Sequence, residues 1–313
     1  MSLADCITTL SDKSKQLSYK DLVALSALAP EELTAFHKTW LKVNDSKRRE
    51  IVNRLVDLAE DNLDVDFEGI FMLCLKDKDV QVKSSAIEGL WECDNRILIS
   101  ILSSILVNDE SVIVRAKAAM ALSKFALLSH LGKMLNKDSD NIIATLTYII
   151  NSESEDNEVK RRAIESIAPF DTNEVQSIIQ KAYLNEDQRM KYSAIYAMGK
   201  SNNPHWIPTI VRELKSADSE TRYEAANACG EMAEEDLIPD LLELFDDDDI
   251  EIQSSAVGAV GNIGGNMARR ALLNTLNVSD PTLAEAAQTA LAKLDAGEDL
   301  VDISINPYDR LSN

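Results

Sequence analysis

A small residue recurs along this chain at an almost constant interval. Alanine occupies this position in seven units, and the last five follow one another at a spacing of 31 residues. The alanines are Ala86, Ala118, Ala163, Ala194, Ala225, Ala256 and Ala287, with spacings of 32 and 45 between the first three. An internal period of this length is typical of chains that stack similar units, none of which can bury its apolar face alone. The chain is therefore predicted to form a stack of repeats.

Each alanine lies at the centre of a predicted amphipathic helix. Mostly apolar residues stand four positions before and four positions after it, and a small residue stands three after. This spacing gives the helix a narrow face against which another helix can pack closely. A residue suited to capping a helix N-terminus lies seven positions before each alanine. These predicted caps are Asp79, Ser111, Asp156, Asp187, Asp218, Asp249 and Asp280.

Shorter segments lie between these helices and have their own helical spacing of apolar residues, for example at 205–214, 235–245 and 268–276. Each unit therefore contains a helix, a turn and a second helix, and the chain is predicted to be all-α with about seven to eight helical hairpins. The content of only 10 glycines and 7 prolines agrees, because β-rich folds need many special turns.

The order of aspartate, apolar, basic, alanine, small and apolar residues resembles the HEAT repeat. The resemblance is to the short form found in bacterial proteins and in chains related to phycobilin lyases, and it covers roughly residues 66–295. It implies a right-handed α-α superhelix, that is, a HEAT/armadillo-like solenoid, with contacts between aspartate and a basic residue from one repeat to the next. The basic position holds Lys83, Arg115, Lys160, Lys191 and Arg222, and departs to Gln253 and Ala284 in the last two units.

Three regions are predicted along the chain. Residues 1–65 are expected to form an N-terminal helical cap, with a possible degenerate repeat around Ile51, because terminal repeats must shield an open face. Residues 66–295 hold the repeats, and residues 296–313 form a C-terminal tail without a helical period. The unit between Ala118 and Ala163 is 14 residues longer than the others, which predicts one lengthened helix and a polar loop.

Charge and cysteine content narrow the function classes. The chain has 53 acidic and 32 basic residues and a net charge of −21, so it repels phosphate backbones and is not expected to bind nucleic acid. The four cysteines have no metal-ligand spacing and are interpreted as reduced thiols of a cytoplasmic protein. We expect no membrane span, no signal peptide, no metal and no cofactor. The acidic run at 245–251 lacks the glycine and the spacing of a calcium loop.

The outward positions of the repeat helices, two before and two after the alanine, suggest a binding surface. In the family that the chain resembles, this helix lines the concave face. Tyrosine and arginine are enriched at binding hot spots, and three of the chain's 7 tyrosines fall in the middle repeats. The candidate residues are Arg161, Glu165, Tyr192, Tyr196, Tyr223 and Asn227. The alternative is that the rings only cover neighbouring helices. Trp91 either faces the groove edge or caps a turn, and the second role is favoured.

These features predict a non-catalytic scaffold that binds a protein or peptide, for example a partner with basic segments. The alternative is an accessory subunit of a lyase-type modification enzyme, similar to the phycobilin lyases. Deoxyhypusine hydroxylase also uses HEAT-like repeats, but it binds iron through His-Glu pairs. Here His37, His130 and His205 are followed by lysine, leucine and tryptophan, so that metal site cannot be built. The sequence shows no arrangement of a nucleophile and a base.

Overall fold

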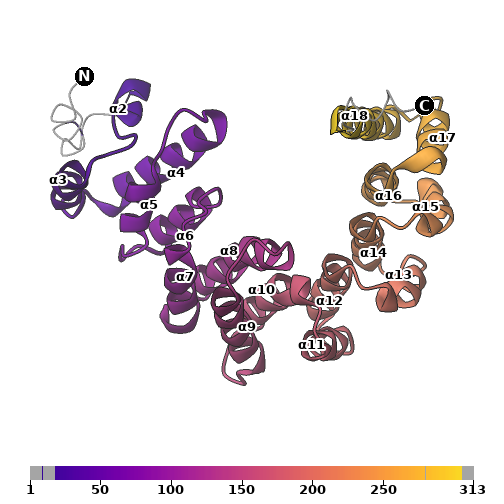
Figure 1. Ribbon diagram of the computed structural model, residues 1–313, viewed down its shortest axis with the longest axis horizontal. Coiled ribbons are helices and arrows are strands. Elements are labelled where there is room, and N and C mark those ends of the chain that lie inside the picture. The colour runs from indigo at the N-terminus through magenta and orange to yellow at the C-terminus, as the bar shows by residue number, and fades with distance from the viewer. Residues whose placement is uncertain (1–8, 10–17, 279, 305–313) are drawn as a thin grey trace, which may run out of the picture. The chain divides into compact units, whose positions relative to one another are not determined.

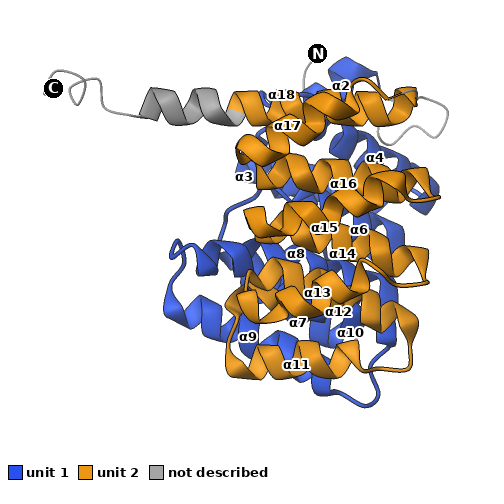
Figure 2. Cartoon of the chain, turned by 90° about the vertical axis from the view of Figure 1, so that its right-hand side faces the viewer, with its two compact units in different colours: residues 1–166 blue, residues 167–313 orange. Residues whose placement is uncertain are grey.

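The computed structural model describes residue 9, residues 18–278 and residues 280–304, with side chains up to residue 296. The described residues form helices joined by short turns, with no β-strand among them, as the sequence predicted. The chain divides into two compact units, residues 1–166 and residues 167–313 (Figure 2). Each unit is a stack of helical pairs and is described in turn.

Unit 1 contains the helices from α2 to α10 (Figure 1). They are α2 (Tyr19–Val23), α3 (Pro30–Trp40), α4 (Asp45–Asp61), α5 (Glu68–Cys74), α6 (Val80–Gly89), α7 (Ile97–Asn108), α8 (Val112–His130), α9 (Asn136–Asn151) and α10 (Asn157–Ile167). Helices α4, α6 and α8 pack side by side, and α5 and α7 pack behind α6 and α8. Ala86 and Ala118 are fully buried, and Leu55 fills the equivalent place in α4. Helix α4 covers the segment around Ile51, where the sequence predicts a degenerate repeat.

Unit 2 continues the pattern with shorter first helices. Its α-helices are α11 (Asn173–Tyr183), α12 (Gln188–Ser201), α13 (Ile207–Glu213), α14 (Ser219–Met232), α15 (Ile238–Glu243), α16 (Ile250–Ile263), α17 (Gly265–Thr275) and α18 (Pro281–Ser304). Short 3₁₀ turns η1 to η4 occupy Ala168–Phe170, Pro204–Trp206, Glu235–Leu237 and Leu244–Asp246. Helices α12, α14, α16 and α18 pack side by side in this order. The four repeat alanines on them are fully buried.

The predicted caps lie at the helix starts. The side chains of Asp187, Asp218 and Asp249 accept hydrogen bonds from backbone amides of the first turns of α12, α14 and α16. Ser111 differs, because its side chain makes no capping hydrogen bond, although its amide donates to Asp109 over 2.9 Å, as that of Asp249 does to Asp247. Polar side chains thus satisfy amides that a helix N-terminus leaves without partners, and the helix starts are fixed by short-range chemistry.

Ion pairs of the kind that the family resemblance implies are present at Lys83, Arg115 and Arg222. Arg222 of α14 binds Asp247 in the next turn over 2.7 Å. Arg115 of α8 binds Glu155 over 2.7 Å, and Lys83 of α6 pairs with Asp109. Arg115 and Arg222 also donate to the backbone carbonyl six residues earlier, and Gln253, where the pattern departs to glutamine, keeps this contact with the carbonyl of Asp247 over 2.5 Å. The ion-pair ladder between repeats therefore gives way to a contact within one turn.

Glycine sets the closest approach between the repeat helices of unit 2. Gly199, Gly230 and Gly261 stand five positions after the repeat alanine. A Cβ atom on Gly199 would lie 2.6 Å from the Cα atom of Ala228, and a Cβ on Gly230 would lie 2.8 Å from the Cα of Ala259. Because real Cβ atoms do not approach backbone atoms so closely, these positions admit only glycine without a shift of the helices.

Two segments differ in length from the regular repeat. Helix α8 has 19 residues and α9 has 16, so both helices of the long unit are extended, whereas the sequence predicted one. Helix α18 continues to Ser304, past Ala296, where the helical pattern of the sequence stops. The segment predicted as a tail therefore begins as helix, because extending a formed helix needs no new nucleus. Residues 305–313 lie outside the described part of the chain.

Candidate binding site

The six candidate residues lie on three helices. Arg161 and Glu165 are on α10 in unit 1. Tyr192 and Tyr196 are on α12 in unit 2, and Tyr223 and Asn227 are on α14. Since α12 and α14 pack side by side, the structure brings the four residues of unit 2 onto neighbouring helices.

Tyr192 has a structural role. It is only partly exposed, and its hydroxyl hydrogen-bonds to the carboxylate of Asp218, the cap of α14, and to the side chain of Gln188. Burial and the hydrogen bond to Asp218 raise the pKa of Tyr192. The hydroxyl of Thr221, followed by the amide of the same residue and the Tyr192 hydroxyl, lowers the pKa of Asp218. Tyr192 thus ties α12 to the start of α14, which favours the structural alternative for this ring.

Tyr196 and Tyr223 present more of their surface, with 37% and 36% of it exposed. The Nζ atom of Lys200 lies 5.6 Å from the ring centre of Tyr196 and pairs over 2.7 Å with Glu231 of α14. Tyr223 lines a depression of about 270 Å³ at the starts of α14 and α16. Asn227 accepts a hydrogen bond from Ser255 of α16 over 3.0 Å. We call Tyr196 and Tyr223 the tyrosine pair.

The charged candidates of α10 have partners within their own helix. Arg161 pairs with Glu158 over 2.6 Å, and Glu165 pairs with Arg162 over 2.9 Å. Both are contacts between residues three positions apart, which face one another on a helix surface. These side chains therefore form ion pairs that stabilise α10, and a partner would have to compete with these contacts.

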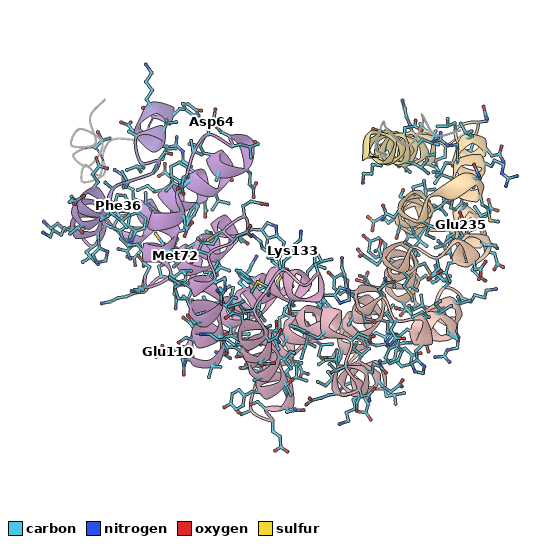
Figure 3. All side chains as sticks on the ribbon, in the orientation of Figure 1. Phe36, Asp64, Met72, Glu110, Lys133 and Glu235 are labelled. Atoms are coloured by element: carbon cyan, nitrogen blue, oxygen red, sulfur yellow. The ribbon has the colours of Figure 1, made fainter. Side chains whose placement is uncertain are left out.

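A second surface, which the sequence did not predict, is a cleft of about 780 Å³ in unit 1. It lies between the C-terminal ends of α4 and α6, with α5 forming its floor. Figure 3 labels Asp64, which lies in the loop after α4. Leu63 and Val65 of the same loop form one wall of the cleft. We call this space the acidic cleft. Its lining is Val56, Ala59, Glu60, Leu63, Val65, Asp66, Phe67, Glu68, Phe71, Glu88, Gly89, Leu90, Trp91, Glu92 and Cys93.

Apolar and acidic groups share this lining. Phe67 and Phe71 are buried beneath it, whereas Trp91 keeps 51% of its surface exposed. Trp91 therefore lines this cleft from the turn that follows α6. The lining holds five carboxylates and no lysine, arginine or histidine. Two of these carboxylates have partners that are not part of the lining. Lys117 pairs with Glu88, and Asn95 donates to Glu68 over 3.1 Å.

The register of the repeat explains why the cleft exists. Glu60 of α4 stands five positions after Leu55, at the place that glycine occupies in α12, α14 and α16. Helix α6 also ends at Gly89, three positions after its alanine, whereas α12 runs to seven positions after. The ends of α4 and α6 therefore do not close on one another. The signal in the sequence was that Glu60 and Trp91 stand five positions after Leu55 and Ala86, where three later units have glycine.

The described residues include no group of three or more histidine, cysteine, aspartate or glutamate side chains placed to hold a metal ion. Within the part of the chain that the structure covers, no helix is both long and apolar enough to cross a membrane. Cys74, Cys93 and Cys229 are free thiols, and Cys6 lies outside the described residues. Burial raises the pKa of Cys229 to about 12, so its thiol stays protonated at neutral pH.

Comparison with solved structures finds matches that cover most of this chain. The E. coli protein YibA is 16% identical over 91% of this chain and 99% of its own, with a TM-score of 0.43. Human deoxyhypusine hydroxylase, in complex with glycerol, is 13% identical over 94% of this chain and 96% of its own, with a TM-score of 0.35. Kap95p, in a structure describing its binding to RanGDP, is 10% identical over 93% of this chain and 45% of its own, with a TM-score of 0.50.

Comparison with curated proteins finds no match. A family model described as HEAT repeats matches residues 69–149 and 207–292, which together make up more than half of the chain. The matched segments contain the buried alanines and the ladder residues of α6, α8, α14 and α16. The chain therefore belongs to the HEAT-repeat family.

Proposed function

We propose that this chain is a non-catalytic scaffold that binds a protein or peptide through the outward face of its repeat helices. The observation that carries the proposal is the exposure of the tyrosine pair on the adjacent helices α12 and α14. Tyrosine rings bury a large area with little loss of side-chain freedom and offer a hydroxyl, which makes them frequent anchors of interfaces. Kap95p is a protein of this fold whose structure describes binding to RanGDP, which is compatible with such a role.

The surroundings of the tyrosine pair support a fixed binding surface. Lys200 and Glu231 pair across α12 and α14, and Asn227 and Ser255 are joined across α14 and α16. These contacts hold the three helices in register, so little ordering is needed when a partner binds. With a net charge of −21, the chain favours partners with basic segments over nucleic acid. The three free thiols fit the cytoplasmic location that we propose.

The tyrosine pair can be tested by affinity capture from native lysate, followed by a binding measurement with the purified partner. The Tyr196→Ala/Tyr223→Ala variant is expected to bind at least about tenfold more weakly than wild type, the loss typical of removing interface anchors. Tyr192 is kept, because its hydroxyl holds the cap of α14. The matched control is Tyr19→Ala/Tyr148→Ala, which removes two rings that are more exposed and lie in unit 1.

A partner that binds both double variants as tightly as wild type would remove the tyrosine pair from the proposal. A partner lost from both would point to a general effect of removing aromatic surface. A purified chain that carries a bound chromophore would instead support the role of an accessory subunit in a lyase-type modification enzyme.

A further inference from the structure

We propose that the acidic cleft of unit 1 is a second binding site, which takes a peptide segment with a bulky apolar side chain flanked by lysine or arginine. The cleft lies wholly in unit 1 and shares no residue with the tyrosine pair. The proposal therefore goes beyond the function proposed above, and each site can be tested without the other.

The apolar half of the cleft is suited to one large side chain. The volume of the whole cleft, about 780 Å³, lies within the range of about 300–1,000 Å³ typical of ligand pockets. Phe67 and Phe71 form a buried floor, and the half-exposed ring of Trp91 forms a wall. Leaving Trp91 and the almost fully exposed Leu63 in water is unfavourable, and a bulky apolar group between them would cover both. An anchor of this kind carries most of the affinity in many interfaces.

The charged half of the cleft selects cations. Glu60, Asp66 and Glu92 lie around the apolar floor, and no ion pair to any of them is present among the described residues. Helices α4 and α6 both end at the cleft, so their C-terminal carbonyls add partial negative charge. The amide at the start of α5 is already taken, because Glu68 donates to Asp66 over 2.8 Å. Lysine or arginine on either side of the apolar anchor would therefore meet carboxylates.

The walls are held in place by contacts within unit 1. Lys124 of α8 donates to the backbone carbonyl of Trp91 over 2.7 Å and pairs with Asp94 over 2.8 Å. Asn95 donates to Glu68 of α5 over 3.1 Å. The turn that carries Trp91 is thus tied to α8 on one side and to α5 on the other. A preformed site of this kind loses little entropy on binding, which favours a specific ligand.

Charge also decides between a foreign peptide and a second copy of this chain. With 53 acidic and 32 basic residues, a second copy would bring further negative charge to a site lined by five carboxylates. Like charges brought together in this way oppose association. The occupant that complements the cleft is a basic segment of another protein.

The test uses the purified full chain and three synthetic peptides of equal length. The first has a central phenylalanine with two lysines on each side, the second has serine in place of phenylalanine, and the third has glutamates in place of the lysines. Trp40 and Trp206 are both 2% exposed, so Trp91 is the solvent-exposed tryptophan of the chain, and excitation at a wavelength that tyrosine does not absorb reports on it. The first peptide is expected to shift the Trp91 emission to shorter wavelength and to bind at least about tenfold more tightly than either of the others.

Charge reversal locates the site. Glu60→Lys/Glu92→Lys is expected to weaken the first peptide at least about tenfold, and Trp91→Ala should weaken it while leaving the weak binding of the serine peptide unchanged. The matched control is Glu110→Lys/Glu153→Lys, which makes the same change of charge at two exposed turn residues outside the cleft. Circular dichroism of each variant checks that the helices remain.

Several results would overturn the proposal. They are equal weakening by the two reversed pairs, binding without a change in Trp91 emission, and no binding of the first peptide at millimolar concentration. A dimer in sedimentation that shields Trp91 from iodide would show that a second copy is the occupant. The Tyr196→Ala/Tyr223→Ala variant should bind the first peptide as wild type does, which separates failure of this site from failure of the tyrosine pair.

Discussion

Replacing Gly199 by alanine is expected to lower the free energy of unfolding by about 3 kcal/mol, the upper part of the usual range for overpacked cores. Alanine is the better helix former by about 1 kcal/mol, so local preference alone predicts the opposite sign. The added Cβ atom would lie 2.6 Å from the Cα atom and 2.9 Å from the Cβ atom of Ala228. The obstacle is the backbone of α14, which cannot rotate away as a flexible side chain can.

Equilibrium denaturation in urea, followed by circular dichroism, measures this effect. The matched control is Gly258→Ala in α16, where a Cβ atom would meet no heavy atom within 4 Å. That variant is expected to gain about 0.5–1 kcal/mol, because alanine loses less backbone freedom on folding than glycine. If both variants were stabilised, α12 and α14 would not approach one another as closely as the structure places them.

The repeat and its helix starts could be predicted because they depend on chemistry close in sequence. A cap such as Asp187 acts on amides of the next two or three residues, and a buried alanine such as Ala194 belongs to a face defined by helical spacing. Both kinds of signal recur in every unit, so each repeat supports the interpretation of the others. The same regularity makes the sequence a weak guide to function, because it describes what all units share.

The candidate tyrosines show where helical spacing stops being informative. Tyr192 and Tyr196 lie two positions before and two positions after Ala194, and both were predicted to face outward. Tyr192 is close to the start of α12, where the cap of the next repeat helix, Asp218, is within reach of its hydroxyl. Tyr196 lies one turn further along and keeps more exposed surface. The angle around a helix predicts the face, but the position along the helix decides which neighbour is met.

The acidic cleft escaped prediction for a related reason. Its residues come from α4, α5, α6, the loop between α4 and α5 and the turn after α6, and most stand outside the frame that marks the repeat. The informative comparison is between units at one offset. Five positions after the frame residue stand Gly199, Gly230 and Gly261 in unit 2, but Glu60 and Trp91 in unit 1. A departure from the repeat at a packing position thus predicts an opening between helices, and such openings are where a regular stack can gain a specific site.

Glu213 is expected to be the most stabilising carboxylate of unit 2, and Glu213→Ala should lower the free energy of unfolding by about 2 kcal/mol. It is 6% exposed, accepts a hydrogen bond from Lys191 over 2.8 Å and another from the hydroxyl of Tyr183. Removing one partner of a buried ion pair costs about 3–5 kcal/mol, and the smaller figure here allows for the partial exposure of Lys191. The loss is expected because Lys191 and Tyr183 would keep their burial without their acceptor.

The pH dependence tests the charge of Glu213 separately from its size. Burial raises the pKa of Glu213. The hydrogen bonds from Lys191 and Tyr183 lower it by more than burial raises it, so the folded pKa lies below the usual 4.5. Its contribution to stability is therefore full above pH 4.5 and is lost as the pH falls through the folded pKa. The difference in unfolding free energy between wild type and Glu213→Gln should be largest at neutral pH and shrink in acid.

An exposed ion pair elsewhere in unit 2 provides the control for Glu213. Glu243 pairs with Lys215 over 3.0 Å, but both side chains are exposed. Exposed ion pairs contribute little because water screens them and their side chains lose freedom on pairing. Glu243→Gln should therefore leave the urea midpoint at neutral pH nearly unchanged. Equal effects of Glu213→Gln and Glu243→Gln would contradict this prediction. The contact of Glu213 with Lys191 and Tyr183 would then add no more stability than a surface ion pair. Helices α11, α12 and α13 would be held together by their apolar faces alone.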